Sequence, residues 1–233
     1  MSVIAVCGLP GKGKTLFATY LMKKKYKREN NIFKRFFSKK RFINIFSNYP
    51  IKLDDKKNIY SYKISLNDFL YFKKQVPDSF IVLDEFQSYF DSLEYKNFPK
   101  RISQNFQFHR HFSIKDIYLI SQHPSRIVKQ ARVLVNEFYN ITKFIKLPFG
   151  IAFLRYNIYY NFEDFGKSVD VKKEDVIYDF KKKIVLFKYK KVFKSYDTKY
   201  MKALVEDKDY IKTDMYDHKL MNLNDIKSIF NIN

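Results

Sequence analysis

The sequence is poor in the residues that mark disulfide-bonded, fibrous or linker-like proteins. Its single cysteine, Cys7, excludes an internal disulfide framework and a cysteine-based zinc site, and it suits a reducing compartment. Five Gly and six Pro exclude a collagen-like or linker-like composition. Acidic residues are scarce, 24 against 45 Lys and Arg, which gives a formal net charge of +21. Hydrophobic residues still make up 46% of the 233 positions, so a wholly disordered chain is excluded and one large α/β domain with appendages is expected.

The basic excess favours polyanionic partners, such as nucleic acid, anionic lipid or the phosphates of a nucleotide. It is concentrated between Lys23 and Lys63, where 14 residues are basic and 3 are acidic, and where Ile32–Phe42 alternates aromatic with cationic side chains. We interpret this stretch as a basic insertion that contacts DNA or an acidic membrane. The alternative is a solvated charged surface combined with the codon bias of an AT-rich genome, because Lys outnumbers Arg by 37 to 8.

Signals for export or membrane insertion are not apparent. The N-terminus has no basic region before a long apolar run. The most apolar window, Phe144–Phe162, contains Lys146, Pro148 and Arg155 and alternates as a strand does. We therefore expect neither a secreted protein nor a membrane-spanning helix.

Periodicity predicts an α/β fold with a mostly parallel sheet flanked by helices. Short apolar runs predict buried strands at Val3–Cys7, Ile45–Tyr49, Phe80–Leu83 and Asp116–Ser121. Helices are expected over Leu16–Lys27, Ser65–Gln75, Phe98–Phe112, Ser125–Ala131 and Asn222–Phe230. From about residue 133 to 200, alternating runs indicate an antiparallel, β-rich portion with turns near Pro148–Gly150 and Phe165–Gly166, followed by a tail at 201–233.

The turn after the first predicted strand contains a complete phosphate-binding motif, Gly8-x4-Gly13-Lys14-Thr15. Glycines let backbone N–H groups converge on phosphate oxygens, and the following helix N-terminus adds its partial positive charge. Lys14 is expected to reach the β- and γ-phosphates of ATP, and the Thr15 hydroxyl to bind Mg²⁺. The residues expected around the nucleotide are Gly8, Leu9, Pro10, Gly11, Lys12, Gly13, Lys14, Thr15 and Leu16.

Two acidic residues follow the strand Phe80–Leu83, as in a Walker B motif. We expect Asp84 to hold Mg²⁺ together with Thr15, and Glu85 to polarise the attacking water. A strand that ends in acidic residues is common by itself, so this interpretation depends on the phosphate-binding motif upstream. A carboxylate directly after the Walker B Asp favours a hydrolysing motor over a nucleotide kinase.

Further candidates come from the third predicted strand and from the arginines around it. Gln122 ends that strand, where parallel sheets present ligand-binding groups, and it is a candidate to sense or orient the γ-phosphate. Arginines neutralise charge between phosphates in the transition state. The arginines in this region are Arg101, Arg110, Arg126 and Arg132, and we single out Arg110 and Arg132 as catalytic candidates that act in trans if the motor is a ring.

The segments GLPGKGKT, FIVLDEFQSYF and RISQNFQFHRHFSIKDIYLISQHPSRIVKQARVLV resemble the zonula occludens toxin (Zot) family, which includes the gene I assembly ATPase of filamentous phages. VFKSYDT at Val192–Thr198 is similar to the segment that closes the family's ATPase domain, so the resemblance covers about residues 1–200. It implies a RecA-like core akin to FtsK–HerA motors and a role in assembling and exporting single-stranded-DNA virions or packaging their DNA. We also expect a homo-oligomer that is a ring only when assembled, with a hexamer as one option. Many members continue into a membrane-spanning helix and a periplasmic region, which we do not expect here.

Together these features predict an ATP-hydrolysing, Mg²⁺-dependent motor whose partners are single-stranded phage DNA, coat proteins or both. We place it on the cytoplasmic side of the infected cell, with peripheral contact to the inner membrane or to a membrane partner. Three alternatives stay open. They are a non-hydrolysing, nucleotide-gated scaffold of the assembly machine, a small-molecule P-loop kinase, and a secreted effector.

Overall fold

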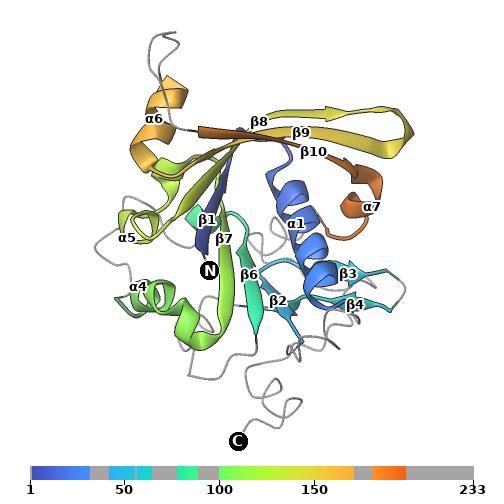
Figure 1. Cartoon of the computed structure of the whole chain (residues 1–233), viewed down its shortest axis with the longest axis horizontal. Coiled ribbons are helices and arrows are strands. Elements are labelled where there is room, and N and C mark those ends of the chain that lie inside the picture. The colour runs from blue at the N-terminus through green and yellow to red at the C-terminus, as the bar shows by residue number, and fades with distance from the viewer. Residues whose placement is uncertain are drawn as a thin grey trace, which may run out of the picture.

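The computed structural model describes residues 2–31, 42–55, 57–64, 78–88, 100–170 and 180–197. Its centre is one eight-stranded sheet in the order β10-β9-β8-β1-β7-β6-β2-β5, with a small separate sheet of β3 and β4 (Figure 1). The strands are β1 (Ser2–Cys7), β2 (Asn44–Ser47), β3 (Lys52–Asp54), β4 (Ile59–Tyr60), β5 (Tyr62–Lys63), β6 (Ser79–Leu83), β7 (Ile114–Ile120), β8 (Glu137–Lys146), β9 (Ile151–Tyr159) and β10 (Phe180–Lys188). The helices are α1 (Lys14–Glu29), α4 (Lys100–Gln107), α5 (Lys129–Arg132), α6 (Phe162–Asp170) and α7 (Tyr189–Phe193).

The central strands form the predicted parallel sheet. β1 pairs in parallel with β7, β7 with β6, and β6 with β2. Every residue of β2 and β6 is buried, as expected for strands of a parallel sheet that is covered on both faces. The predicted strands at residues 3–7, 80–83 and 116–121 are therefore confirmed, and their carboxyl ends meet at one edge of the sheet.

The β-rich portion does not form a sheet of its own but continues the central one. β8 pairs in parallel with β1 on one side and antiparallel with β9 on the other. β9 then pairs antiparallel with β10, which lies at the edge of the sheet. The turn between β8 and β9 falls at the short helical turn Pro148–Gly150, as predicted.

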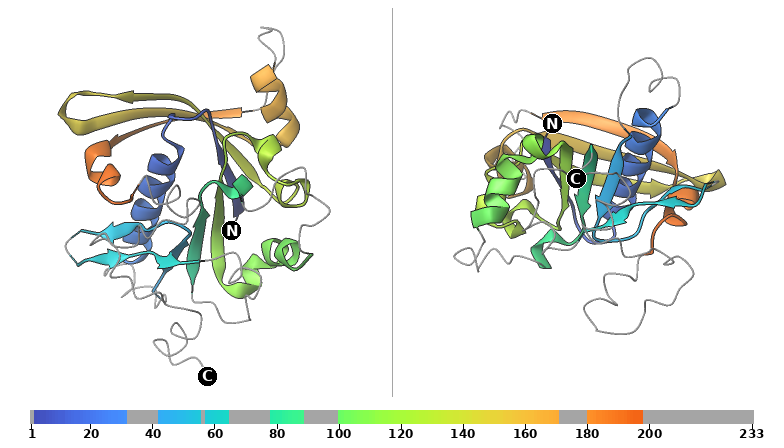
Figure 2. Two further views of the ribbon diagram at one scale, coloured as in Figure 1. Left: turned by 180° about the vertical axis from the view of Figure 1, so that it is seen from behind. Right: turned by 90° about the horizontal axis from the view of Figure 1, so that it is seen from below.

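Helices cover both faces of the sheet and create two apolar cores (Figure 2). Figure 1 shows α1 on one side of β8–β10, and its Phe17 and Met22 pack with Leu154 and Phe187. On the other side, Ile102 of α4, Ala131 of α5 and Phe165 of α6 pack on the opposite face. The helix that begins at the phosphate-binding motif is thus fixed between the sheet and α7.

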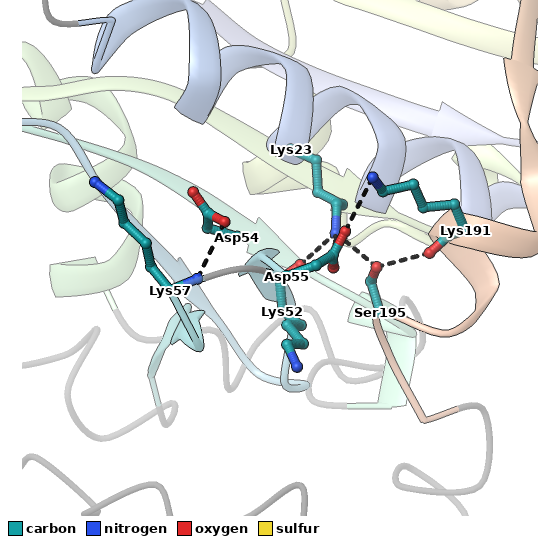
Figure 3. A network of polar contacts seen from close by, with 7 residues as sticks. All are labelled: Lys23, Lys52, Asp54, Asp55, Lys57, Lys191 and Ser195. Carbon is teal, nitrogen blue, oxygen red and sulfur yellow. Dashed lines mark hydrogen bonds and ion pairs between the residues drawn. The ribbon is translucent and has the colours of Figure 1, made fainter.

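A buried lysine connects α1 to the end of the described chain (Figure 3). The Nζ of Lys23 donates hydrogen bonds to the Lys52 carbonyl (2.6 Å), the Asp55 carboxylate (3.2 Å) and the Ser195 hydroxyl (2.6 Å). Lys191 forms a second ion pair with Asp55 at 3.3 Å, and burial lowers the pKa of Lys23. The network joins α1, β3 and the segment after α7, so Lys23 is not available to a polyanion.

Lys25, a second cation of the basic stretch 23–63, is also engaged within the protein and is not available to a polyanion. Lys25 pairs with Asp116 at 2.6 Å and lies over the rings of Phe80 and Tyr118. The described part of this stretch contributes the end of α1 and strands β2–β5, while the aromatic and basic run Ile32–Phe42 lies almost wholly outside the described residues. Its contact with a polyanion stays a prediction.

Two predicted helices are interrupted. In the first, α4 ends at Gln107 and a 3-10 turn, η3 (His109–Phe112), follows. The buried His109 ring bonds the Phe106 carbonyl at 2.6 Å, which competes with the regular helical pattern. In the second, Ile127 and Val128 are extended and buried in the core, so the region is split into a 3-10 turn, η4 (Pro124–Arg126), and α5.

The predicted turn near Phe165–Gly166 is wrong, because these residues lie within α6. Glu163 and Asp164 in the first turn complement the helix dipole, and Phe162 and Phe165 pack on the core, which outweighs the turn tendency of Gly166. The last alternating run, residues 184–193, is a strand over its first half, within β10, and changes to helix only from Tyr189, at α7. The predicted helices Ser65–Gln75 and Asn222–Phe230 lie outside the described residues. No helix in the described ranges is long and apolar enough to cross a membrane.

Candidate nucleotide site

The loop between β1 and α1 has the conformation that its glycines allow. Gly11 and Gly13 have φ of 75° and 79°, in the left-handed region that favours glycine. Gly13 is the residue before α1, and the backbone N–H of Phe17 closes the first helical turn on its carbonyl at 2.8 Å. The N–H of Gly8 donates to the carbonyl of Gln122 at 3.2 Å, so the start of the loop is attached to the end of β7.

Lys14 and Thr15 are the reactive members of this loop. Lys14 is buried, 7% exposed, and its Nζ donates to the Leu9 carbonyl at 3.2 Å across the loop. The Thr15 hydroxyl donates to the Asp84 carboxylate at 2.8 Å, although the two residues are 69 positions apart. The fold therefore brings the phosphate-binding motif and the acidic strand end together, as the parallel-sheet prediction required.

The remaining motif residues divide into loop and core. Leu9, Pro10 and Gly11 are exposed, with the Leu9 side chain 68% accessible. Leu16 is buried in the core below the sheet, so its side chain packs on the protein interior. A Cβ placed on Gly13 would lie 3.4 Å from the Phe144 ring, which shows that β8 packs directly against the loop.

Asp84 is a buried carboxylic acid at the end of β6, 5% exposed. Burial raises the pKa of Asp84 from 3.8 to about 6, and the nearby Glu85 acts in the same direction. Its main chain is held by one side chain: Asn48 Nδ2 donates to the Asp84 carbonyl and the Asp84 N–H donates to Asn48 Oδ1, both at 2.8 Å. Asn48 follows β2, the strand next to β6.

Glu85 has a strained backbone, with φ of 46°. Its N–H donates to the Asp84 carboxylate at 2.9 Å, and its own carboxylate accepts a short hydrogen bond from the Gln87 side chain. The Glu85 carbonyl is bonded by both the N–H and the hydroxyl of Ser88, at 2.8 and 2.7 Å. A non-glycine residue held in this conformation by its neighbours is a feature that recurs at functional sites.

Gln122 lies where the sequence analysis placed it, beyond the end of β7 and beside the phosphate-binding loop. Its side-chain carbonyl accepts a hydrogen bond from Arg126 Nη1 at 3.0 Å, which brings an exposed guanidinium to this edge of the sheet. Ser121 before it is buried and bonds the His123 carbonyl at 3.0 Å.

The two arginines singled out from the sequence are not in this cluster. Arg110 is exposed in the 3-10 turn before β7, and the seven residues of that strand, roughly 20 Å, separate it from the edge where Gln122 lies. It therefore does not reach the site of its own chain. Arg132 lies 4.1 Å from the Phe162 ring and bonds the Ser125 carbonyl at 3.4 Å. These contacts attach α5 to α6, and the action of Arg132 in trans stays a prediction.

The oxygens of Thr15 and Asp84 are suited to Mg²⁺, a hard cation that binds through one or two carboxylates and substrate phosphates. Asp84 is buried, has a raised pKa and is bonded to the Thr15 hydroxyl. A divalent cation bound to these oxygens would stabilise the ionised form of the carboxylate. The residues present therefore fit the ion.

Sequence reasoning missed Asn48 and Phe144. The signal for Asn48 was available, because a polar residue at the carboxyl end of a parallel strand is a candidate by the same argument as Gln122. Phe144 gave no such signal, since its contact with the loop depends on β8 pairing with β1.

The sheet, the glycine-rich loop before α1 and the acidic end of β6 define the fold of a RecA-like P-loop NTPase. A family model described as "Zonular occludens toxin (Zot)" matches residues 2–199, and the chain belongs to that family. A comparison with curated protein sequences found no significant match.

One solved structure shows the same fold over most of its length, and others are more distantly similar. The N-terminal domain of zonular occludens toxin from Neisseria meningitidis has 19% identity and a TM-score of 0.55, with coverage of 84% of this chain and 98% of that one. The genome packaging NTPase B204 of Sulfolobus turreted icosahedral virus 2, in complex with AMPPCP, is 12% identical with a TM-score of 0.41 over 61% and 75% of the two chains. A KaiC-like protein from the hyperthermophilic archaeon Pyrococcus horikoshii is 11% identical with a TM-score of 0.38 over 80% of this chain and 89% of that one.

Proposed function

We propose that this protein is an ATP-hydrolysing motor that assembles and exports filamentous phage virions or packages their single-stranded DNA. The observation that carries the enzymatic part is the hydrogen bond between Thr15 and Asp84. It unites a phosphate-binding loop with a buried carboxylate in the arrangement that binds Mg²⁺ and nucleotide. Membership of the Zot family supports the role in virion assembly.

Each site residue has a distinct role in this proposal. Lys14 leaves the Leu9 carbonyl and binds the β- and γ-phosphates, as the loop amides do. Thr15 and Asp84 hold Mg²⁺, which neutralises charge on the phosphates when bound. Glu85 orients the attacking water and accepts its proton, while Gln122 contacts the γ-phosphate.

Among the arginines, we assign Arg126 to the nucleotide of its own chain, because its hydrogen bond to Gln122 holds it at the correct edge of the sheet. Arg110 remains a candidate to act in trans, on the nucleotide of a neighbouring subunit in a homo-oligomeric ring. We place the protein on the cytoplasmic side of the inner membrane, where DNA and coat proteins are available.

The test is steady-state ATP turnover of the full chain with and without single-stranded phage DNA. We expect turnover that DNA stimulates, and a loss of about a hundredfold or more in Glu85→Gln with nucleotide binding retained. A matched control is Glu163→Gln, an exposed acid on α6. Turnover that DNA leaves unchanged would favour movement of coat protein, and equal rates for Glu85→Gln and wild type would favour the nucleotide-gated scaffold.

A further inference from the structure

The free end of the β8–β10 region carries exposed apolar side chains on one face and at the tip of its hairpin. Along β9, Ala152 and Leu154 point into the core around α1, so by strand alternation Phe153 between them points to the opposite face. The register places Ile145 and Leu186 on either side of Phe153, one from each neighbouring strand. We call this surface the outer patch; it consists of Ile145, Leu147, Phe149, Phe153, Ile184 and Leu186.

The exposure of these side chains is high. Phe149 at the tip of the hairpin is 98% accessible, and Ile184 and Leu186 on β10 are 56% and 61% accessible. Ile145 and Leu147 are 37% and 38% accessible. Within the described ranges, α6 covers this face only at the far end of β8 and β9, and the hairpin extends away from it (Figures 1 and 2). An apolar surface of this kind on one face marks an interaction site.

The charged residues that the three described strands contribute around the outer patch are all basic. Residues 142–158 and 180–188, which form the free end of the three strands, contain seven Lys or Arg and no Asp or Glu. Lys143 and Arg155 are cross-strand neighbours in the row next to Phe153, and Arg155 pairs with Ile184 on β10. Lys182 and Lys188 lie on the same face of β10 as Leu186, by the same alternation.

We propose that the outer patch binds the surface of an anionic lipid bilayer. Aliphatic and aromatic side chains enter the interface between headgroups and acyl chains, while the surrounding cations pair with acidic headgroups. The positive charge around the outer patch favours an anionic bilayer over a second copy of the chain. A second copy of the chain would bring the same cationic face and repel it, and would have to bury the like charges of Lys143, Arg155, Lys182 and Lys188 on each side.

Single-stranded nucleic acid, like an anionic bilayer, would pair with the cations around the outer patch, but it would not make use of the patch's aliphatic side chains. Bases stack on aromatic rings, whereas the β10 part of the outer patch consists of Ile184 and Leu186. Aliphatic side chains at more than half exposure gain from transfer into hydrocarbon and offer nothing to a base. The composition of the surface therefore favours lipid.

The experiment is co-sedimentation of the full chain, without nucleotide, with vesicles of phosphatidylcholine alone or mixed equally with phosphatidylglycerol. We expect binding to the mixed vesicles only. Phe149→Ser and Leu186→Ser should each lower the partition coefficient about tenfold. Phe108→Ser is the matched control, since Phe108 is 49% exposed and lies outside the outer patch. Lys182→Glu should weaken binding, and Lys129→Glu on α5 should not.

Unchanged partitioning of both outer-patch variants would overturn the proposal, as would equal binding to neutral vesicles. It would also be overturned if these variants lost single-stranded DNA binding or self-association, measured by sedimentation, and kept their vesicle binding. The proposal does not depend on ATP hydrolysis. Nucleotide binding of the same variants, measured separately, confirms that they fold and keeps the two proposals distinguishable.

Discussion

The side chain of Asn48 forms two hydrogen bonds of 2.8 Å with the main chain of Asp84, one to its carbonyl and one from its N–H. An amide that pairs with a peptide group in this way continues the sheet by one residue beyond the end of β2. The carboxylate of Asp84 is therefore positioned by a residue that neither binds phosphate nor reacts. Asn48 is a positioning residue for the metal-binding carboxylate.

Replacing Asn48 with alanine should impair turnover beyond its effect on stability. The chain offers a matched control, because Asn30 makes the same pair of hydrogen bonds, both 2.8 Å, to the main chain of Ile43 far from the site. Each alanine variant should lose about 1–3 kcal/mol of stability, since buried main-chain groups lose their partners. Only Asn48→Ala should also lower kcat and weaken the apparent affinity for Mg²⁺.

Chemical denaturation measures the stability of the two variants, and steady-state kinetics measure their kcat and apparent affinity for Mg²⁺. If Asn30→Ala and Asn48→Ala reduced kcat equally, the effect of Asn48 would be one of stability alone, and its role in positioning Asp84 would be refuted.

The raised pKa of Asp84 predicts a specific pH dependence of stability. Between pH 3.8 and about 6 the folded state binds more protons at this residue than the unfolded state, so stability falls as the pH rises through that range. The side chain introduced by Asp84→Asn does not ionise, so this variant should not lose stability as the pH rises. Without nucleotide it should be more stable than wild type by about 1–3 kcal/mol at pH 7.5, with no such advantage below about pH 4.

Urea unfolding of wild type and Asp84→Asn across this pH range measures the difference. The same titration predicts that Mg²⁺ binding weakens in wild type below about pH 6, where protons compete for Asp84. A constant stability difference between the two proteins at every pH would contradict the assignment.

Cys7 should report opening of the sheet. It is fully buried at the end of β1, and burial raises the pKa of its thiol, so neither access nor ionisation permits reaction in the folded state. A maleimide should label the native protein slower than the urea-unfolded protein by a factor on the order of 10³ or more. A cysteine at the 73% exposed position Val133, introduced in a Cys7→Ser background, should react at once. Rapid labelling of native Cys7 would mean that β1 is accessible.

The sequence predicted the centre of the fold better than its margins, for a physical reason. Runs such as Phe80–Leu83 are buried on both faces, so their apolar character alone specifies a parallel strand. The polar residues directly after these strands then had to meet at one edge, which placed Asp84, Gln122 and the Gly8–Thr15 loop together.

The errors arise where a contact distant in sequence decides the local structure. Gly166 suggested a turn, but Phe165 packs with Phe138 and Tyr159 and keeps the chain helical. The role of Asn48 depends on β2 lying beside β6, and that of Arg132 on α5 lying beside α6. Which elements become neighbours depends on the order of the strands in the sheet and on the placement of the helices. The hydrophobic periodicity of the sequence does not specify either of these.

The most direct test of the central claim is calorimetric titration of the protein with a non-hydrolysable ATP analogue and Mg²⁺. Lys12 and Lys14 lie in the same loop, but only the buried Lys14 spans it to Leu9. We predict that wild type and Lys12→Ala bind the analogue, and that Lys14→Ala binds at least about a hundredfold more weakly. Absence of binding by a folded wild type, or equal binding by Lys14→Ala, would contradict a nucleotide site in this loop.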